Sequence, residues 1–226
     1  MKLGAKPIIR VGVLGDIHAH DRLLERALGF LGEQRLCATL SVGDIVDGEG
    51  DLERTIALLR AAGVEAVLGN HERWLLNGIE RHRPHSTLSI NDEIRAYLDS
   101  LPPLRHYSTP RGGLLLGHGV FDDDMAFLRP STLGYKLQEI PSLFRLMKEP
   151  GVDYFIGGHT HERMVRAFAG VTVINAGTLS HYGEPTLLIV DFETERARFY
   201  HVSEDTPPTF IEALPIPRPL PLQHTE

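Results

Sequence analysis

The stretch Ser41-Val42-Gly43-Asp44-Ile45-Val46-Asp47 decides how the rest of the chain is interpreted. An apolar run from Cys37 to Val42 leads into it and ends in Gly-Asp. Such a run predicts a buried strand that delivers the Asp44 carboxylate at its carboxyl end, where open α/β sheets place their ligand sites. A carboxylate has two oxygens, so Asp44 has the chemistry to bridge two cations.

Other short apolar runs end in the same way, each followed by polar side chains that can bind a metal. In chain order these side chains are Asp16 and His18, Asn70 and His71, His118, and His159 with His161. Members of the pairs Asp16/His18 and His159/His161 lie two residues apart, so both can reach one small region from an extended chain or a tight turn. Carboxylate, imidazole and amide oxygen without thiolate suit a borderline divalent metal such as manganese, iron, zinc or nickel. The sequence therefore predicts a metal site assembled at strand ends.

The N-terminal part of the chain alternates between expected strands and helices. Strands are expected over residues 8–14, 37–42 and 64–68. The helices between them are expected to be capped by Asp21 and Asp51. This alternation predicts right-handed crossovers and a parallel start to the sheet.

The remainder is less regular. Helices are expected over residues 92–98 and 137–147, a hairpin over 104–116 and a buried strand over 152–156. Residues 165–168, 171–174, 186–191 and 197–202 are expected to be short antiparallel strands of a second sheet. The predicted fold class is α/β, a four-layer α-β-β-α sandwich of two mixed sheets flanked by helices. Residues 1–205 are expected to form this one domain, and the proline-rich residues 206–226 an extended or mobile tail.

Composition limits the classes of function. The chain has 226 residues, 42% of them hydrophobic, and a formal net charge of -7, which gives no general attraction to nucleic acid or to an anionic membrane. The one cysteine, Cys37, cannot form an internal disulfide and is expected to be a small buried hydrophobe. No run has transmembrane length and the start has no signal-peptide core, so a cytoplasmic protein is expected.

Several motifs together resemble a known family. They are Gly15-Asp16-Ile17-His18, Gly43-Asp44-Ile45-Val46-Asp47, Gly69-Asn70-His71-Glu72, Gly117-His118 and Gly157-Gly158-His159-Thr160-His161. In this order they resemble the motif set of the calcineurin-like metallophosphoesterases. Asn175-Ala176-Gly177-Thr178 is similar to a loop of the small bacterial and archaeal phosphodiesterases of that family.

The resemblance implies a binuclear metal phosphoesterase that acts on a small phosphoester. It implies two divalent transition-metal ions, with manganese expected first and iron, nickel or zinc as alternatives, and a hydroxide between them as the nucleophile. One ion would be held by Asp16, His18, Asp44 and His161, and the other by Asp44, Asn70, His118 and His159. Asp44 would be the shared ligand. His71, oriented by Asp47, would face the substrate and act on the leaving group.

One position departs from the family pattern. The phosphatase branch has an arginine directly after the second Asp of its G-D-x-x-D motif, and this chain has Gly48 there. Loss of that forked partner for a doubly charged monoester predicts a phosphodiester substrate, with a nucleotide as one candidate. The candidate basic residues for replacing the arginine are Arg73, Arg81, Arg83 and Arg163.

Two alternatives stay open from the sequence. One is a phosphomonoesterase that acts on proteins or on dinucleoside polyphosphates. The other is a catalytically silent scaffold of the same fold, although a scaffold would be free to lose a ligand or His71. The basic segment Arg81 to His85 is expected to be a solvated loop, although it falls where a lid over the site would lie. Asp122 to Asp124 are expected to face water. The sequence does not indicate an oligomeric state.

Overall fold

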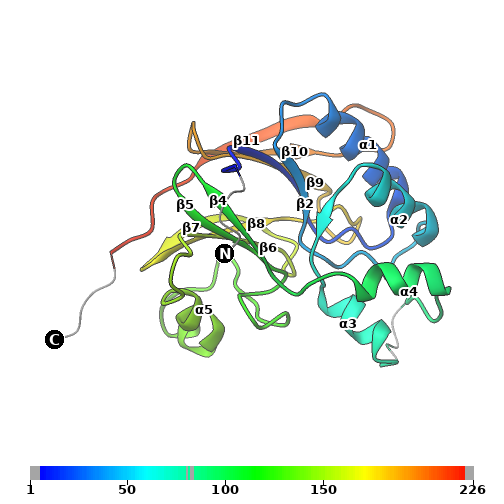
Figure 1. Ribbon diagram of the computed structural model, residues 1–226, viewed down its shortest axis with the longest axis horizontal. Coiled ribbons are helices and arrows are strands. Elements are labelled where there is room, and N and C mark those ends of the chain that lie inside the picture. Colours follow the sequence, from blue (N-terminus) through cyan, green and yellow to red (C-terminus); the bar gives the residue numbers. More distant parts are fainter. Residues whose placement is uncertain (1–5, 80, 82–83, 222–226) are drawn as a thin grey trace.

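The computed structural model describes residues 6–79, 81 and 84–221, and its strands form two mixed sheets (Figure 1). The six-stranded sheet has the order β11-β10-β9-β1-β2-β3, and the five-stranded sheet the order β4-β5-β6-β8-β7. The strands are β1 (Arg10–Leu14), β2 (Ala38–Ser41), β3 (Glu65–Ala66), β4 (Arg105–Thr109), β5 (Gly112–Leu116), β6 (Tyr154–Gly157), β7 (Arg163–Phe168), β8 (Val171–Ala176), β9 (Thr186–Asp191), β10 (Arg196–His201) and β11 (Thr209–Pro215). The helices are α1 (Asp21–Gly32), α2 (Leu52–Ala61), α3 (Asn70–Leu76), α4 (Asp92–Asp99), α5 (Pro141–Leu146) and the 3-10 helix η1 (Gly134–Glu139).

Alternating side chains of the strands divide the interior into layers. In β9, Leu188 and Val190 point into the layer between the two sheets, whereas Leu187 and Ile189 point to the layer under the helices α1 and α2. This period of two follows from the pleat of a strand. Each fully buried side chain of this kind contributes about 1.5–3 kcal/mol through removal of apolar surface from water.

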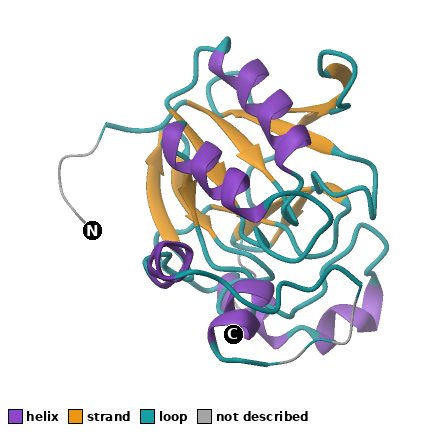
Figure 2. Cartoon of the chain, turned by 90° about the vertical axis from the view of Figure 1, so that its right-hand side faces the viewer, coloured by secondary structure: helices purple, strands orange, loops and turns teal. Residues whose placement is uncertain are grey.

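Helices cover the outer faces of both sheets. The helices α1 and α2 pack on the six-stranded sheet and lie side by side (Figure 2). On the five-stranded sheet, α5 packs through Leu143 and Leu146 against Phe155 of β6. The order helix, sheet, sheet, helix confirms the predicted four-layer sandwich (Figure 1). Among the described residues, no helix has both the length and the apolar character needed to cross a membrane.

The two N-terminal helix caps differ from each other. At α2, Asp51 accepts a hydrogen bond from the backbone N–H of Arg54 at 2.9 Å, which is the predicted cap. At α1, His20 holds the capping position without a side-chain bond, and Asp21 lies within the first turn. The Asp21 carboxylate instead accepts from the backbone N–H of Asp51 at 3.0 Å, so it ties the two helix starts together.

Parallel strands in each sheet bring several carboxyl ends together. The strands β1, β2 and β3 are parallel, as predicted from the alternation of strands and helices. In the other sheet β5, β6 and β8 are parallel, with β4 and β7 antiparallel at the two edges. Ligand sites form at such carboxyl ends because the loops that follow them are free to carry polar groups.

The prediction that four C-terminal strands share one second sheet was wrong. The hairpin β7–β8 joins the five-stranded sheet beside β6, whereas β9 pairs antiparallel with β1 and β10 pairs with β9. Both β1 and β9 carry apolar side chains on two faces, which suits neighbouring central strands that are covered on both sides. Local alternation does not reveal which strand a segment pairs with.

Three smaller expectations are corrected by the structure. The helix expected over 137–147 is divided into η1 and α5, because Pro141 lacks an N–H and starts a new helix at its first turn. Residues 209–215, assigned to the tail, form β11 and pair with β10 at the edge of the six-stranded sheet. Cys37 is exposed rather than buried, although its sulfur accepts a hydrogen bond from the N–H of Ile9 at 3.4 Å.

Candidate metal centre

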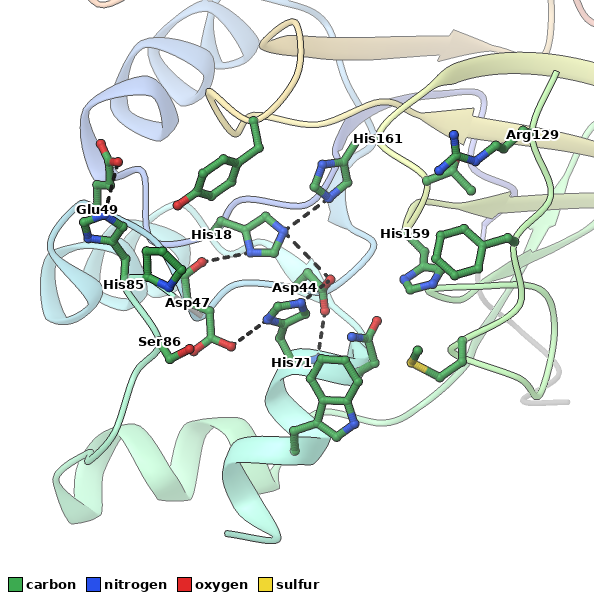
Figure 3. A pocket seen from close by; sticks show the side chains of 17 residues that line it. His18, Asp44, Asp47, Glu49, His71, His85, Ser86, Arg129, His159 and His161 are labelled. Atoms are coloured by element: carbon green, nitrogen blue, oxygen red, sulfur yellow. Dashed lines mark hydrogen bonds and ion pairs between the residues drawn. The ribbon is translucent and has the colours of Figure 1, made fainter. Parts of the chain in front are cut away.

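Loops from both sheets bring the predicted site residues together. Asp16 and His18 follow β1, Asp44 and Asp47 follow β2, and Asn70 and His71 start α3 just after β3. His118 follows β5, and His159 and His161 follow β6. In Figure 3 the side chains of His18, Asp44, His71, His159 and His161 point toward a common centre. The structure therefore gathers all nine predicted site residues at the carboxyl ends of the strands.

The loops reach this arrangement through unusual backbone conformations. Ten described residues other than glycine have a positive φ, and six of them are Asp16, His18, Asp44, Asp47, His159 and His161. A left-handed conformation is unfavourable by roughly 1–2 kcal/mol for an L-residue with a side chain. Such residues gather at functional sites, where the surrounding structure holds them in place.

Glycine permits a close backbone approach next to Asp44. Gly43 has a φ of +93°, and a Cβ placed on it would lie 2.5 Å from the backbone nitrogen of Gly69. The loops after β2 and β3 therefore touch through their backbones. This contact sets Asp44 beside Asn70 and His71.

One group of ligand atoms lies on the β1 side of the centre. Atoms of Asp16, His18 and His161 lie within 4.8 Å of one another. The Nε2 atoms of His18 and His161 are 3.3 Å apart, and His161 Nε2 is 3.8 Å from an Asp16 oxygen. Since His18 Nδ1 donates to the carbonyl oxygens of Val46 and Asp47 at 3.1 and 3.0 Å, a neutral His18 turns an acceptor nitrogen toward the cluster.

A second group lies on the side of the five-stranded sheet. Atoms of Asp44, His118 and His159 lie within 4.8 Å of one another. His118 Nδ1 donates to the carbonyl of Val42 at 2.8 Å, and His118 Nε2 faces Asn70 Oδ1 at 2.9 Å and Asp44 Oδ2 at 3.2 Å. If His118 were neutral, its Nε2 would be an acceptor that faces two further acceptors, Asn70 Oδ1 and Asp44 Oδ2. The contacts require a positive charge, either a proton or a cation.

His159 supplies the clearest sign of a missing partner within the described part of the chain. Its Nε2 atom is buried and has no hydrogen-bond partner. A buried polar atom left in this way is unfavourable by about 1–3 kcal/mol. A metal ion is a natural partner for an imidazole nitrogen beside a carboxylate.

The electrostatics of the cluster are consistent with a cation site. Burial raises the pKa of the Asp16 carboxyl to about 7. Burial would also raise the pKa of Asp44, but His118, His71 and His18 outweigh it and lower that pKa below its usual range. Burial lowers the pKa of His159 and of His161 to about 4, so both imidazoles are kept in the neutral, ligating form. Burial opposes protonation of His118 too, yet Asp44 raises its pKa to about 10.

Glu72 holds the Asp44 loop in place. This carboxylate is fully buried and accepts hydrogen bonds from the backbone N–H groups of Asp44, Ile45, Val46 and Gly69 at 2.7–2.9 Å. Glu72 belongs to the motif Gly69-Asn70-His71-Glu72, but no role for it was predicted from the sequence. The signal was present, because a Glu three residues after a helix-capping position often bonds back to the start of its helix.

Hydrogen bonds from Asn175 and Thr178 hold the loops that carry Asp16, His159 and His161. Asn175 at the end of β8 donates to the carbonyl of Gly158 at 2.6 Å and to the Thr160 hydroxyl at 3.0 Å. Thr178 donates from its hydroxyl to the carbonyl of Asp16 at 2.9 Å. The Asn175 loop thus connects the His159–His161 turn to the Asp16 turn.

His71 and Asp47 form a hydrogen-bonded pair beside Asp44. His71 Nδ1 donates to Asp47 Oδ2 at 2.6 Å, and His71 Nε2 lies 3.8 Å from Asp44 Oδ2. Burial lowers the pKa of His71, but the bond to Asp47 and the Asp44 charge outweigh it, so the pKa is raised from its ordinary value. Arg81 and the backbone N–H of Thr87 also bind the Asp47 carboxylate, at 2.9 and 2.7 Å.

The three described arginines among the candidate replacements are each paired with a carboxylate of the chain. Arg81 binds Asp47, Arg73 binds Asp124, and Arg163 binds Glu184 and Glu212. Arg83 lies outside the described residues. Asp122 likewise pairs with Arg145, so two members of the acidic triplet bind arginines rather than only facing water.

Gly48 cannot carry a side chain in this backbone. A Cβ on it would lie 1.6 Å from the carbonyl oxygen of His18. Arg129, which sequence reasoning missed, lines the cavity over the centre instead. It sits in an irregular loop after β5, where no local pattern marks it.

The centre opens into a cavity of about 770 Å³. It is lined by His18, Asp44, Asp47, Glu49, Asn70, His71, Trp74, Pro84, His85, Ser86, Met125, Phe127, Arg129, His159, Thr160, His161 and Tyr182. Pro84 and His85 belong to the basic segment Arg81 to His85, and Ser86 follows it directly; His85 and Ser86 are labelled in Figure 3. The site therefore has room for a substrate much larger than phosphate.

The fold and this cluster of carboxylates and imidazoles define a metal-dependent hydrolase of the four-layer sandwich class. Residues 9–195 match the family model described as the calcineurin-like phosphoesterase superfamily domain. The chain therefore belongs to the calcineurin-like phosphoesterase superfamily, and it is a metal-dependent hydrolase of phosphoester bonds.

Individual relatives agree with this membership. Serine/threonine-protein phosphatase 2 of Escherichia coli (strain K12) is 25% identical over 223 residues, which covers 80% of this chain and 95% of that protein. A metallophosphoesterase from Sphaerobacter thermophilus superposes with a TM-score of 0.62 at 20% identity, covering 87% of this chain and 88% of that one. A hypothetical protein from Pyrococcus horikoshii OT3 gives a TM-score of 0.67 at 16% identity, covering 87% and 89%. The two structures share the fold, and the resemblance stated from the motifs is confirmed.

Proposed function

We propose that the chain hydrolyses a phosphodiester with two divalent transition-metal ions, manganese being the first candidate and iron, nickel or zinc the alternatives. Asp16, His18, Asp44 and His161 would hold one ion, and Asp44, Asn70, His118 and His159 the other. The buried, unpartnered Nε2 of His159 beside Asp44 is the observation that carries this proposal. The acceptor atoms that face one another around His118 support it, since a cation relieves their repulsion.

The ions, when bound, supply a field that lowers the pKa of a water molecule and holds the phosphate oxygens during an in-line displacement. The chain fixes where that field acts. The carbonyl of Val42 accepts from His118 Nδ1, and those of Val46 and Asp47 accept from His18 Nδ1, so the Nε2 atoms of these two imidazoles keep their orientation. Glu72 holds the backbone on either side of Asp44, which keeps the shared carboxylate in place.

His71 is proposed as the acid that protonates the departing oxygen. Its Nε2 lies 3.8 Å from Asp44 Oδ2 and faces the cavity, while its Nδ1 is held by Asp47. Arg81 and Thr87 fix the Asp47 carboxylate, so the imidazole has one orientation. A positioned acid of this kind contributes roughly 10²–10⁴-fold in rate.

The preference for a diester is supported by the backbone at Gly48. Because a Cβ there would overlap the His18 carbonyl, an arginine clamp at this position is sterically excluded. A monoester dianion would therefore lack the forked partner that suits its second charge. A diester carries one charge fewer and does not need that partner.

A substrate and metal panel tests this proposal. The protein is stripped with a chelator, reloaded with manganese, nickel, zinc or magnesium, and assayed with bis(p-nitrophenyl) phosphate and p-nitrophenyl phosphate. We expect kcat/KM to be higher for the diester, with manganese most active. A higher kcat/KM for the monoester in every metal would contradict the diester proposal.

A second candidate, phosphomonoesterase activity, is favoured by Arg129. This residue lines the cavity, and its partner Glu162 is 2.9 Å away in an exposed pair that holds it weakly. A guanidinium released from that pair could bind a monoester dianion. The Escherichia coli relative, named as a serine/threonine-protein phosphatase, points the same way. In that case Arg129→Ala would lower kcat/KM for the monoester while leaving the diester unchanged.

A further inference from the structure

The cavity wall beyond the ligand cluster is aromatic. Three rings line it, from Trp74 in α3, Phe127 in the loop after β5 and Tyr182 in the loop after β8. Trp74 lies 5.0 Å from the His71 ring, measured between ring centroids. Phe127 lies 4.4 Å from His159, and Tyr182 lies 6.5 Å from His18. Each ring therefore contacts or borders a different histidine of the centre.

These side chains are not packed into the core. Phe127 is 48% exposed and Tyr182 is 58% exposed, and Met125, which lines the same cavity, is 38% exposed. The one tryptophan of the chain, Trp74, also lines the cavity and is only partly buried. Apolar groups gathered in a concave site serve ligand binding more often than stability.

The surrounding charge favours a planar group over an alkyl chain. The Arg129 guanidinium lies 5.6 Å from the Phe127 ring centroid, and Glu49, Ser86 and Thr160 add polar atoms to the lining. Rings stack on aromatic faces, and the heteroatoms at their edges can bond to such polar groups.

We propose that Trp74 and Phe127 form a subsite for a planar heteroaromatic ring, so the ester hydrolysed is a nucleotide. This inference rests on the proposed phosphodiesterase function and names its substrate class. The ring belongs to the alcohol that stays on the phosphate, and the cavity of about 770 Å³ holds a group of nucleoside size beside the centre.

Two substrates with the same leaving group separate binding at the subsite from the departure of the leaving group. Thymidine 5′-(p-nitrophenyl phosphate) and methyl p-nitrophenyl phosphate both release p-nitrophenolate, so the ratio of their kcat/KM values reports binding of the retained nucleoside. Loss of stacking on a protein ring reduces binding by about 1–3 kcal/mol per base, and 1.4 kcal/mol is tenfold. We expect the wild-type protein to favour the thymidine ester by at least about tenfold.

Variants of the two rings provide the decisive comparison. In the double variant Trp74→Ala/Phe127→Ala we expect the preference, which is the ratio of the two kcat/KM values, to fall to within about twofold. The double variant Trp74→Phe/Phe127→Tyr should retain the preference, because it keeps two aromatic faces. Tyr135→Ala is the matched control, since Tyr135 is 69% exposed and does not line the cavity. A preference that persists in the alanine double variant, or is absent from the wild type, would overturn the subsite.

A binding measurement separates failure of the subsite from failure of the proposed function. Thymidine 5′-phosphate and methyl phosphate are compared as competitive inhibitors of whichever nitrophenyl ester the enzyme hydrolyses. If only monoesters are hydrolysed, the diester proposal fails, yet the subsite still predicts tighter inhibition by thymidine 5′-phosphate that the alanine double variant loses. Equal inhibition by the two phosphates would overturn the subsite whatever ester is hydrolysed.

Discussion

The layer between the two sheets and the loops at the strand ends differ in the polarity of the side chains that they bury. The layer is apolar and its strands have ordinary backbone, with Leu188 and Val190 fully buried. The loops bury carboxylates and imidazoles, place six site residues at positive φ and leave His159 Nε2 without a partner. Apolar burial in the sheets stabilises the fold. This stabilisation allows the loops to hold carboxylates and imidazoles in an arrangement that would not form alone.

The largest effect is expected at the shared carboxylate of the loops. Asp44→Ala should lower kcat/KM by at least about 10⁴-fold, equivalent to about 5.4 kcal/mol, because both ion sites lose a ligand. Circular dichroism should show the same fold. The control is Asp99→Ala, which removes an exposed carboxylate and should leave activity unchanged. Activity within tenfold of wild type in Asp44→Ala would contradict the central position of this residue.

The next effect concerns His71, which is proposed as the acid beside the metal ligands. His71→Asn should keep the metal content and lower turnover by roughly 10²–10⁴-fold for an ester with an alkyl leaving group. The loss should be much smaller for nitrophenolate, which departs without a proton. Asp47→Asn should show the same pattern more mildly. Equal losses on the two leaving groups would mean that His71 binds substrate or metal.

A substitution in the core should lower the stability of the protein and leave its activity unchanged. Leu188→Ala should lower the free energy of unfolding by about 2–5 kcal/mol, because it leaves a cavity between the sheets. Activity per metal-loaded, folded molecule should stay close to wild type. Leu88→Ala is the control, since Leu88 is 84% exposed and should not change stability. Denaturant unfolding and an assay at low temperature measure both quantities.

Glu72 connects the two regions and should give a smaller, mixed effect. Glu72→Gln replaces one acceptor oxygen by an NH₂ group that faces backbone N–H donors. We expect a loss of about 1–3 kcal/mol in stability together with weaker metal binding. Glu139→Gln, an exposed change, serves as the control. If stability and metal affinity are both unaffected, Glu72 does not hold the Asp44 loop.

The sequence predicted which residues lie at the strand ends better than it predicted how the strands pair. Apolar runs that end in Gly-Asp or Gly-His are local signals, so the positions of Asp16, Asp44 and His159 could be placed at strand ends. The partners of β9 depend on long-range pairing, which no local pattern records, and the C-terminal strands were therefore assigned to the wrong sheet. Arg129, Phe127 and Tyr182 come from irregular loops, and only the folded chain reveals that they line one cavity with Trp74 of α3.

The metal content of the protein tests the proposal that each chain binds two ions. Protein purified without a chelator, or reloaded with manganese after stripping, is analysed by inductively coupled plasma mass spectrometry against its concentration. We expect binding that saturates at two ions per chain, reduced mainly at one site in His18→Ala and lost at both in Asp44→Ala. Saturation of the wild-type protein at one ion or none would contradict it.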